Sequence, residues 1–385
     1  MRVAFVGFDF GEYCVRLAGG IAESPGTSVL MFLPKAEAQP YLHLLSSSVE
    51  PRLFDKPRIR QPFKQLKMVF DLVRQIRAFN PDVIHVQLGH LWFNLLALPL
   101  LRRFPLVLTV HDSVIHVGDA ATGKTPQWVY DRACYRARER IVHAPQVKEL
   151  LVKRLGIPAE TVHVIPYVIV GDVDDTVAQH VKEEPTVLFF GRIWPYKGLD
   201  YLIRAEPLIT SKAPQAKIVI AGTGEDFERY RLMMVNPDNF VVLNEYVSDE
   251  KRAELFRQAS VVVLPYIEAS QSFIISIAYR FGKPVVATTV GGLPEMVDDG
   301  RTGFLVPPRD VNALADAVVR LMQNDEMRRT FGENGMRKVN VECAPATVGR
   351  QTRVVYRRAM NDSSPVRDHL IEKQPSSQSS SETFV

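Results

Sequence analysis

Two basic side chains, Arg192 and Lys197, lie in the stretch LFFGRIWPYKGLDYLIRA, residues 188–205. The apolar residues before Gly191 predict a buried strand, the glycine permits a sharp turn, and the residues after Gly198 predict a helix. The first N–H groups of a helix have no intrahelical partner and carry a partial positive charge. Two fixed cations beside such a helix end are suited to bind a diphosphate. An ordinary surface loop with two basic residues is the alternative interpretation.

A second helix start is predicted in PYIEASQSFIISIAYRF, residues 265–281. Ser270 or Ser272 is a suitable N-cap, and the free N–H groups around Gln271 would then point toward an anion. Glu268, at the rim, would repel a phosphate but can accept hydrogen bonds from sugar hydroxyls. The combination indicates a ligand with both sugar and phosphate. An ordinary capped helix with a solvated glutamate is the alternative.

Glycine pairs follow two further predicted strands. Gly222 and Gly224 lie in IAGTGEDFERY, and Gly291 and Gly292 lie in TTVGGLPEM. Glycines permit close backbone approach to a ligand, so the first pair is predicted to flank a base and the second to contact the sugar or nucleotide. None of these loops has the spacing of a dinucleotide fingerprint or a P-loop.

Short apolar runs alternate with helical patterns in both halves of the chain, which predicts an α/β protein with parallel sheets buried on both faces. Two such blocks in series predict two doubly wound Rossmann-like domains that face a central cleft, where ligands bind beyond the carboxyl ends of the strands. The predicted strands are residues 2–8, 27–33, 82–88, 106–112, 140–144 and 163–167, then 186–192, 217–222, 240–246, 260–266, 284–289 and 302–306.

The domain boundary is predicted in the polar segment between residues 167 and 185. The first domain therefore covers residues 1–168 and the second covers 169–340, followed by a helix over 341–360. Residues 361–385 are rich in Ser, Gln and Pro, and are predicted to be disordered because they contain too few apolar residues to offset the ordering entropy.

The composition is that of a globular protein: of 385 residues, 46% are hydrophobic and 23% are charged. The three cysteines lie far apart and the first residues enter a strand directly, which favours a cytoplasmic location without disulfides or a signal peptide. The longest apolar run, residues 91–101, is too short to span a membrane and predicts a buried helix.

Positive charge is concentrated in the first half: residues 1–168 hold 21 Lys and Arg against 14 Asp and Glu. Seven basic residues and one acidic residue lie in segment 56–79, whose apolar residues fit a helical period. A basic amphipathic helix of this kind binds an anionic membrane surface, although it can also be the solvated face of a core helix. Nucleic acid is not an expected partner, because no base-reading motif accompanies the charge. The apolar positions of the pattern are Phe63, Leu66, Val69, Phe70, Val73, Ile76 and Phe79.

With these motifs identified, the chain resembles the retaining GT-B glycosyltransferases of family four, also called group 1 glycosyltransferases. The matching stretches are PDVIHVQ, LVLTVHD, FFGRIWPYKGLDYLIRA, IAGTGE, VVLPYIEASQS and AYRFGKPVVATTVGGLPEMVDDGRTGFLVPP. The resemblance is strong over residues 185–310 and weaker over 1–168. It implies the GT-B fold with a C-terminal helix that packs back on the first domain, and sugar transfer from a nucleoside-diphosphate sugar without a metal or other cofactor.

The resemblance also implies roles for single residues. Arg192 and Lys197 match the basic pair that contacts the donor diphosphate and stabilises its developing charge. His111 matches a histidine that faces the transferred sugar. Gly11 lies in the loop where the family usually has a glycine pair, but this chain has GFDFGEY there.

The two-glutamate pattern of the family is altered. Its two positions fall on Ala269 and Ile277, so the resemblance is to a branch with EASQS in which Glu268 supplies the carboxylate. An isoleucine cannot accept a hydrogen bond from a ribose. Glu295 or the backbone is then expected to contact the ribose.

Three functions are compatible with these observations. The preferred one is a retaining hexosyl- or related glycosyltransferase with a glycan or lipid-linked acceptor, active in polysaccharide or glycoconjugate synthesis at the inner face of a membrane. The second is a catalytically weak GT-B protein that acts as a scaffold. The third is another enzyme with two Rossmann-like domains, such as a nucleotide-sugar epimerase or a nicotinamide oxidoreductase, although the missing dinucleotide fingerprint disfavours the oxidoreductase.

Overall fold

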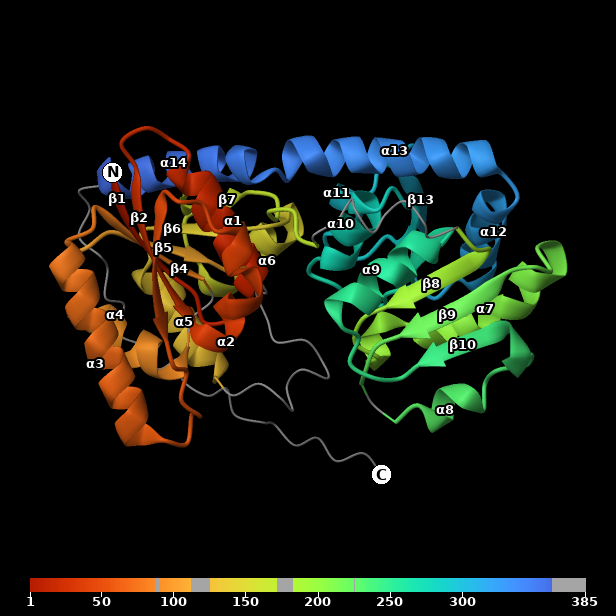
Figure 1. The fold of residues 1–385 in the computed structure, drawn as a ribbon, viewed down its shortest axis with the longest axis horizontal. Helices are drawn as coiled ribbons and strands as arrows, with labels where there is room; N and C mark the ends of the chain where they lie inside the picture. The colour runs from red at the N-terminus through yellow and green to blue at the C-terminus, as the bar shows by residue number, and fades with distance from the viewer. Residues whose placement is uncertain (88–89, 112–124, 172–182, 225, 362–385) are drawn as a thin grey trace, which may run out of the picture.

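The computed structural model describes residues 1–87, 90–111, 125–171, 183–224 and 226–361. It has two α/β domains side by side, each built around a parallel sheet with helices on both faces (Figure 1). The predicted fold class, two doubly wound Rossmann-like domains, is confirmed. The disordered tail predicted over 361–385 lies, apart from its first residue, outside the described residues.

The sheet of the first domain has the order β3-β2-β1-β4-β5-β6-β7. All its pairings are parallel. The chain therefore changes direction across the sheet between β1 and β4, which is where doubly wound sheets bind ligands. The strands are β1 Arg2–Val6, β2 Ser28–Pro34, β3 Val49–Phe54, β4 Val83–Gln87, β5 Leu106–Thr109, β6 Glu139–Val142 and β7 Val162–Val164.

The helices of the first domain connect these strands. They are α1 Gly11–Ala22, α2 Lys35–Ala38, the 3₁₀ turn η1 Gln39–Leu44, α3 Pro62–Phe79, the π-helical turn η2 Phe93–Ala97, α4 Leu98–Leu100, α5 Gln127–Arg136, α6 Pro145–Leu155 and the 3₁₀ turn η3 Ala159–Thr161. The apolar run 91–101 forms the short η2 and α4 segments. None of the described helices is long and apolar enough to cross a bilayer.

The second domain repeats the plan with the strand order β10-β9-β8-β11-β12-β13, again fully parallel. All six strands predicted for this half are present, each slightly shorter than predicted. They are β8 Thr186–Phe190, β9 Lys217–Ala221, β10 Phe240–Leu243, β11 Val261–Leu264, β12 Val285–Thr288 and β13 Gly303–Val306.

Helices α7 and α12 pack together on one face of this sheet, and α10 packs against α13. The helical segments are the 3₁₀ turn η5 Pro195–Lys197, α7 Leu199–Lys212, α8 Glu228–Arg231, the 3₁₀ turn η6 Pro237–Asn239, α9 Asp249–Gln258, α10 Phe273–Arg280, α11 Leu293–Met296, α12 Val311–Met322, α13 Asp325–Glu342 and α14 Pro345–Asn361.

Strand β3 was not among the predicted strands. Its sequence, VEPRLF, contains Pro51 and two charged residues, and every residue after Val49 is exposed or half-exposed at the edge of the sheet. Edge strands tolerate proline and charge because one side of the strand needs no hydrogen-bond partner. A search for apolar runs therefore misses such a strand.

The predicted helix over 56–79 begins only at Pro62, and its predicted apolar face is wrong at two positions. Phe63 is 85% exposed and Phe70 is 57% exposed. The helical period places both on the face opposite to the one that packs on the sheet. The buried face consists of Gln65, Met68, Val69, Leu72, Val73 and Ile76.

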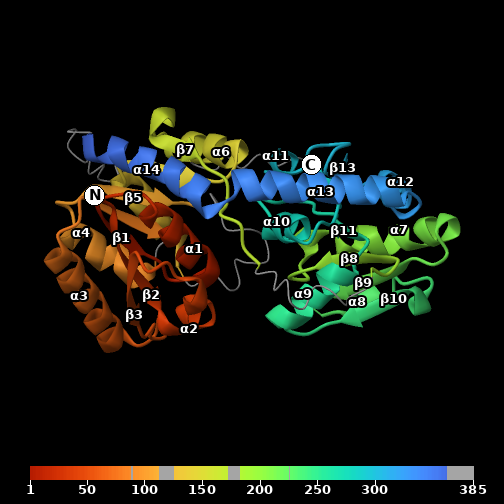
Figure 2. The ribbon, with the colours of Figure 1, turned by 45° about the horizontal axis from the view of Figure 1, so that its top comes forward.

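The chain crosses between the domains twice, at adjacent places. The N–H of Ile169 donates to the carbonyl of Cys343 over 2.8 Å, so the outgoing and returning segments are hydrogen-bonded to each other. Helix α13 ends on the second domain, and α14 begins at Pro345 and packs on α1 of the first. Figures 1 and 2 show the two helices in line along one side of both domains. The predicted return of the C-terminal helix is confirmed, although α14 begins later than the predicted boundary at residue 341.

Two glycines let α14 lie directly on α1. A Cβ added at Gly20 would lie 1.9 Å from the carbonyl oxygen of Pro345, and one at Gly349 would lie 2.2 Å from the carbonyl carbon of Gly20. Arg353, on α14, donates to the carbonyls of Gly20 and Ile21 over 3.1 and 3.0 Å. The crossing is therefore a contact between two backbones.

Candidate active site

The loop after β8 holds the predicted basic pair in a fixed turn. Gly191 has φ 119°, and its N–H donates to the carbonyl of Ala221 over 2.9 Å. The turn η5 then ends at Gly198, which is left-handed (φ 64°) and leaves no room for a Cβ beside the carbonyl oxygen of Pro265, 2.0 Å away. These contacts hold the Arg192–Lys197 loop against the end of β9 and against the segment that follows β11.

Tyr266, which was not predicted, lies at the centre of this arrangement. The Lys197 ammonium lies 3.8 Å from the centroid of the Tyr266 ring. Arg192 donates to the hydroxyl of Tyr196 over 3.2 Å, and its charge acts on Tyr266 as well. Burial raises the pKa of Tyr266 to about 12, so its hydroxyl stays protonated. The two cations thus flank one buried, neutral aromatic residue.

The same tyrosine contacts the start of α10. Its hydroxyl lies 3.3 Å from Oγ of Ser272, and Ser272 is the N-cap of α10, accepting from the N–H of Ile274 over 3.4 Å. The predicted helix start at Ser270 or Ser272 is therefore at Ser272. Arg192, Lys197 and the N-terminus of α10 are brought together around the Tyr266 ring.

The other residues of the EASQS segment have different surroundings. Glu268 is exposed, and its N–H donates to the carbonyl of Tyr196 over 3.4 Å. The carbonyl of Ser270 accepts from the N–H of Gly292 over 3.0 Å. The amide of Gln271 donates to the carbonyl of His143 in the first domain. Gln271 therefore contacts the opposite domain in this structure.

The predicted glycines allow loops to pack on each other. A Cβ at Gly222 would lie 1.9 Å from the Gly191 carbonyl oxygen, and one at Gly224 would lie 1.9 Å from that of Ile193. Gly291 is left-handed (φ 52°), and a Cβ added there would lie only 1.5 Å from the carbonyl oxygen of Ala269. At Gly292 an added Cβ would lie 2.5 Å from the carbonyl oxygen of Ser270. The close approach predicted for these glycines is thus to neighbouring backbone. Gly11 is similar, with the Glu37 carbonyl oxygen 1.8 Å from an added Cβ.

His111 lies at the end of β5 and is 2% exposed. Its Nε2 lies 3.2 Å from Oε1 of Gln87, and its Nδ1 lies 3.2 Å from the hydroxyl of Tyr167. The imidazole stacks on the Tyr167 ring, and the ring of Phe10 lies 4.7 Å away on the cleft side. In this structure the His111 imidazole is therefore covered by aromatic side chains, among them Phe10 and Tyr167.

A buried polar chain extends from His111 to the C-terminal helix. Gln87 Nε2 lies 3.1 Å from Nε2 of His85, whose other nitrogen lies 2.5 Å from the hydroxyl of Tyr356 on α14. The hydroxyl of Thr109 lies 2.7 Å from Nε2 of His85. Burial lowers the pKa of His85 to about 3, which keeps the imidazole neutral. These residues fix the orientation of His111.

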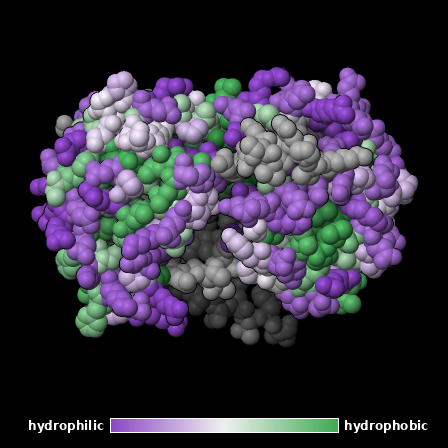
Figure 3. Space-filling view, in the orientation of Figure 1, coloured by the Kyte–Doolittle hydropathy of each residue, from purple (hydrophilic) through white to green (hydrophobic). Residues whose placement is uncertain are grey.

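Contacts between the domains surround the N-terminus of α10. The ring of Phe273, the first residue of α10, lies 4.2 Å from that of Tyr167. Gln146 donates to Oε1 of Glu295 over 2.7 Å, so the carboxylate expected to contact a ribose is hydrogen-bonded to the first domain. Ile277 is 6% exposed and packs against Gly171 in the crossing segment, where a Cβ would lie 3.5 Å from its Cγ1. Figure 3 shows the hollow between the two lobes.

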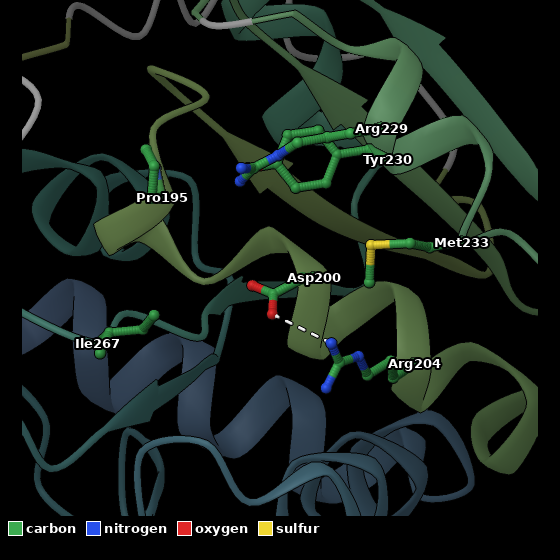
Figure 4. A pocket seen from close by; sticks show the side chains of 7 residues that line it. All are labelled: Pro195, Asp200, Arg204, Arg229, Tyr230, Met233 and Ile267. Carbon is green, nitrogen blue, oxygen red and sulfur yellow. Dashed lines mark hydrogen bonds and ion pairs between the residues drawn. The ribbon is translucent and has the colours of Figure 1, made fainter.

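A surface pocket of about 310 Å³ adjoins both loops that carry the predicted residues (Figure 4). Within it Asp200 and Arg204 form an ion pair at 3.8 Å, and Arg229 lies over the Tyr230 ring. Its lining comes from three separate segments, so no local sequence signal predicted it. The lining residues are Pro195, Asp200, Arg204, Arg229, Tyr230, Met233 and Ile267. Among the residues that the structure describes, no cluster of three or more His, Cys, Asp or Glu is suited to hold a metal.

Each domain matches a known family model. Residues 184–324 match the model described as glycosyl transferases group 1, and residues 11–169 match the one described as glycosyltransferase family 4. The chain is 26% identical over 272 residues to an alpha-D-kanosaminyltransferase of Streptomyces kanamyceticus, which covers 66% of this chain and 70% of that protein. It is 29% identical over 315 residues to a D-inositol 3-phosphate glycosyltransferase of Nocardioides, and this alignment covers 72% of this chain and 67% of that protein. Several other alignments are shorter, such as one of 31% identity over 180 residues to an uncharacterised glycosyltransferase of Methanocaldococcus jannaschii, which covers 46% of each chain.

Solved structures share the whole two-domain fold. Sucrose-phosphate synthase of Thermosynechococcus elongatus has a TM-score of 0.68 at 22% identity, over 93% of this chain and 98% of that one. Anabaena HepE in complex with UDP-glucose has a TM-score of 0.68 at 18% identity, over 93% of this chain and 100% of that one. At these identities the likeness shows the fold.

Proposed function

The chain consists of two GT-B domains of the group 1, family 4 glycosyltransferase type, and from this premise we propose that it transfers a sugar from a nucleoside-diphosphate sugar to a hydroxyl of a glycan or lipid-linked acceptor. The observation that carries the proposal is the convergence of Arg192, Lys197 and the N-terminus of α10 around Tyr266. Relatives and structural neighbours named for sugar transfer or solved with UDP-glucose support a sugar nucleotide as the donor.

In the proposed reaction the bond between the anomeric carbon and the diphosphate oxygen breaks, and a bond to the acceptor oxygen forms. The acceptor hydroxyl proton passes to the departing phosphate on the same face of the sugar, which gives retention of configuration. Arg192, Lys197 and the first N–H groups of α10 stabilise the charge on the leaving diphosphate, so no metal or cofactor is required. Loss of one such contact typically costs about 3 kcal/mol of transition-state stabilisation. Glu268 would contact hydroxyls of the transferred sugar.

Thermal unfolding in the presence of nucleoside-diphosphate sugars tests donor binding. A ligand at 100 times its dissociation constant stabilises a protein by about 2.7 kcal/mol, which raises the unfolding temperature measurably. Arg192→Ala and Lys197→Ala are expected to abolish most of that shift. Lys212→Ala is the matched control, because this lysine lies at the far end of α7 and pairs with Asp316. Equal shifts in all three variants would contradict the proposed donor site.

The proposal that configuration is retained has its own test. The anomeric proton coupling of the product, followed by NMR from the first turnovers, distinguishes retention from inversion. A donor that binds without any transfer would instead favour the scaffold function, for which the replacement of a polar residue by Ile277 is the supporting observation.

We further propose that α3 places the first domain on an anionic membrane. Four side chains at helical spacing form an exposed stripe on α3. They are Phe63, Lys67, Phe70 and Arg74. Alternating aromatic and basic side chains on one face allow the rings to enter the headgroup region while the charges contact anionic lipid. The opposite face of α3 packs in the core, so the helix does not need to unfold to bind.

A further inference from the structure

Two buried polar side chains at the start of η2 have no hydrogen-bond partner within the described part of the chain. Both ring nitrogens of His90 and both side-chain atoms of the Asn94 amide are covered and unpaired. His90 is 6% exposed and Asn94 is 5% exposed. The residues are adjacent on one helical turn, because the N–H of Asn94 donates to the carbonyl of His90 over 2.8 Å. Four unpaired polar atoms are thus gathered in one place.

Such atoms destabilise a folded domain. Each buried donor or acceptor without a partner costs about 1–3 kcal/mol, whereas an apolar residue of the same shape costs nothing of this kind. Aromatic rings pack against one side of the cluster: His90 stacks on Phe8 at 4.9 Å, and Phe93 lies 5.3 Å from the same ring. Unpaired buried groups require a partner, which is either ordered water or a bound ligand. The segment also forms a π-helical turn, which often occurs at functional sites.

The position of the cluster is that of a ligand site. Phe8 and Asp9 follow β1, and His90 follows β4, and these two strands flank the point where the strand order reverses. The next residue, Phe10, is 42% exposed and faces the cleft side of His111. The cluster therefore lies beside the cleft, in the domain opposite to the cations of the candidate donor site.

The charge of the cluster restricts its ligand. The Lys56 ammonium donates to Oδ1 of Asp9 over 2.6 Å and to the carbonyl of Phe8 over 2.8 Å, so its charge is already balanced. Glu37, which lies close enough for both Asp9 and Lys56 to shift its pKa, adds a second carboxylate. Burial lowers the pKa of His90 to about 4, so the imidazole is neutral. A ligand phosphate or carboxylate would find no unbalanced positive charge here.

We propose that His90, Asn94, Asp9 and Lys56 bind hydroxyl groups of the sugar acceptor, and that the acceptor ring held there carries no phosphate or carboxylate. A neutral polyol supplies both donors and acceptors for the imidazole, the amide and the carboxylate, and its C–H faces can pack on Phe8 and Phe10. This inference rests on the proposed glycosyl transfer and specifies the acceptor class for it.

Shape-preserving variants separate this role from a structural one. His90→Phe keeps the stacking on Phe8 and removes the unpaired nitrogens, and Asn94→Leu does the same for the amide. Both variants are expected to unfold at the same temperature as the wild type or higher. Both are expected to lose at least tenfold of acceptor-dependent donor turnover, while the donor-induced thermal shift is unchanged. Retained turnover, or a lower unfolding temperature, would overturn the assignment.

The acceptor class is tested with matched pairs. The readout is the release of nucleoside diphosphate, and the donor is the one that gives the largest thermal shift. The neutral acceptors are myo-inositol, methyl glucoside and methyl mannoside. Each is compared with the corresponding sugar or inositol phosphate. We expect the neutral rings to accelerate release and the phosphates to be at least tenfold poorer. Asp9→Asn removes one of the two carboxylates near Lys56 and is expected to narrow this preference. The inference is refuted if the wild type uses the phosphates better than the neutral rings. It is also refuted if a protein that binds its donor uses none of the neutral rings. If the protein does not bind a donor, the proposed function is refuted instead.

Discussion

Phe10 has a backbone conformation that aromatic residues rarely adopt. Its φ of 61° and ψ of 54° are left-handed, at the N-cap of α1. This conformation costs an L-residue about 1–2 kcal/mol and costs glycine almost nothing. The ring lies 4.7 Å from that of His111 and 6.0 Å from that of Phe273 in the other domain. The strain is therefore compensated by contacts that only a large side chain makes.

Two substitutions separate strain from contact. Phe10→Ala removes the ring and keeps the strain, whereas Phe10→Gly removes both. We expect Phe10→Gly to be more stable than Phe10→Ala by about 1 kcal/mol in urea unfolding, although glycine usually destabilises relative to alanine. The opposite order would show that the backbone at this position is not strained in solution. Both variants are expected to lose the shielding of His111 from the cleft, which faster exchange of its ring protons by NMR would report.

Two buried histidines predict how stability depends on pH. Burial lowers the pKa of His85 to about 3 and that of His90 to about 4. Below the unfolded pKa of about 6.5, the unfolded chain binds protons that the folded chain does not. The free energy of unfolding is therefore expected to fall as the pH falls from 7.5 to 5.5, and His90→Phe should reduce that fall by about 1 kcal/mol. Urea unfolding at the two pH values measures the difference, and an unchanged slope would contradict a neutral, buried His90.

The sequence identifies those site residues whose type and position in a motif are enough to predict where they lie. Arg192, Lys197 and the N-cap at Ser272 follow from a strand, a turn and a helix start. Tyr266 could not be predicted, because a tyrosine after a buried strand has no distinctive spacing and acts through contacts with two separate loops. His90 and Asn94 are informative only once their burial and missing partners are known.

The crossing of α1 and α14 depends on two residues without side chains. Gly349→Ala would place a methyl group 2.2 Å from the Gly20 backbone, and neither backbone can move without separating the helices. We expect a loss of at least about 2 kcal/mol, as for overpacking of a rigid core. The exposed neighbour in Arg350→Ala is the matched control and should change stability by less than about 0.5 kcal/mol. Similar losses in both variants, measured by thermal and urea unfolding, would show that α14 is not held in this way.

The exposed stripe of α3 predicts membrane binding that responds to salt. Lys67→Glu with Arg74→Glu should abolish cosedimentation with vesicles that contain phosphatidylserine or phosphatidylglycerol, and Phe63→Ala with Phe70→Ala should weaken it at least fivefold. Arg350→Glu with Arg357→Glu reverses the same number of charges at exposed positions of α14 and should have little effect. Binding that is unaffected by salt, or equally lost in the control, would contradict a specific role for α3.

Strands made of apolar residues could be predicted from the sequence, and a strand with an exposed side could not. The six strands of the second domain are rich in apolar residues, and a pattern of apolar runs identifies all of them. Strand β3 escapes the same search because one side faces solvent and Pro51 interrupts it. For α3 the period was recognised, but apolar residues occur on both faces, so hydrophobicity alone could not decide whether Phe63 faces the core.

Helix α10 contributes both to the candidate donor site and to the contact between the two domains. Its N-terminus lies beside the cations of the candidate donor site, and its first residue, Phe273, packs on Tyr167 of the other domain. One turn later Ile277 contacts Gly171, whose N–H donates to the buried carboxylate of Glu12 over 2.7 Å. The candidate donor site and the contact between the domains therefore share a single short helix. Alignment to a motif cannot reveal this, because the contact is between segments more than 100 residues apart.

The position of Ile277 predicts what restoring the family glutamate would do. The side chain is buried among Ile169, Val170 and the rest of an apolar cluster, so Ile277→Glu would bury a carboxylate without a cation. We expect a loss of several kcal/mol in urea unfolding and no gain in nucleotide affinity. Ile277→Val, which removes one methylene, should cost about 1 kcal/mol and leave the donor-induced thermal shift unchanged. Tighter nucleotide binding by the glutamate variant would mean that α10 turns this face toward the ribose when the donor is bound, and that the packing against Gly171 belongs only to the state without a donor.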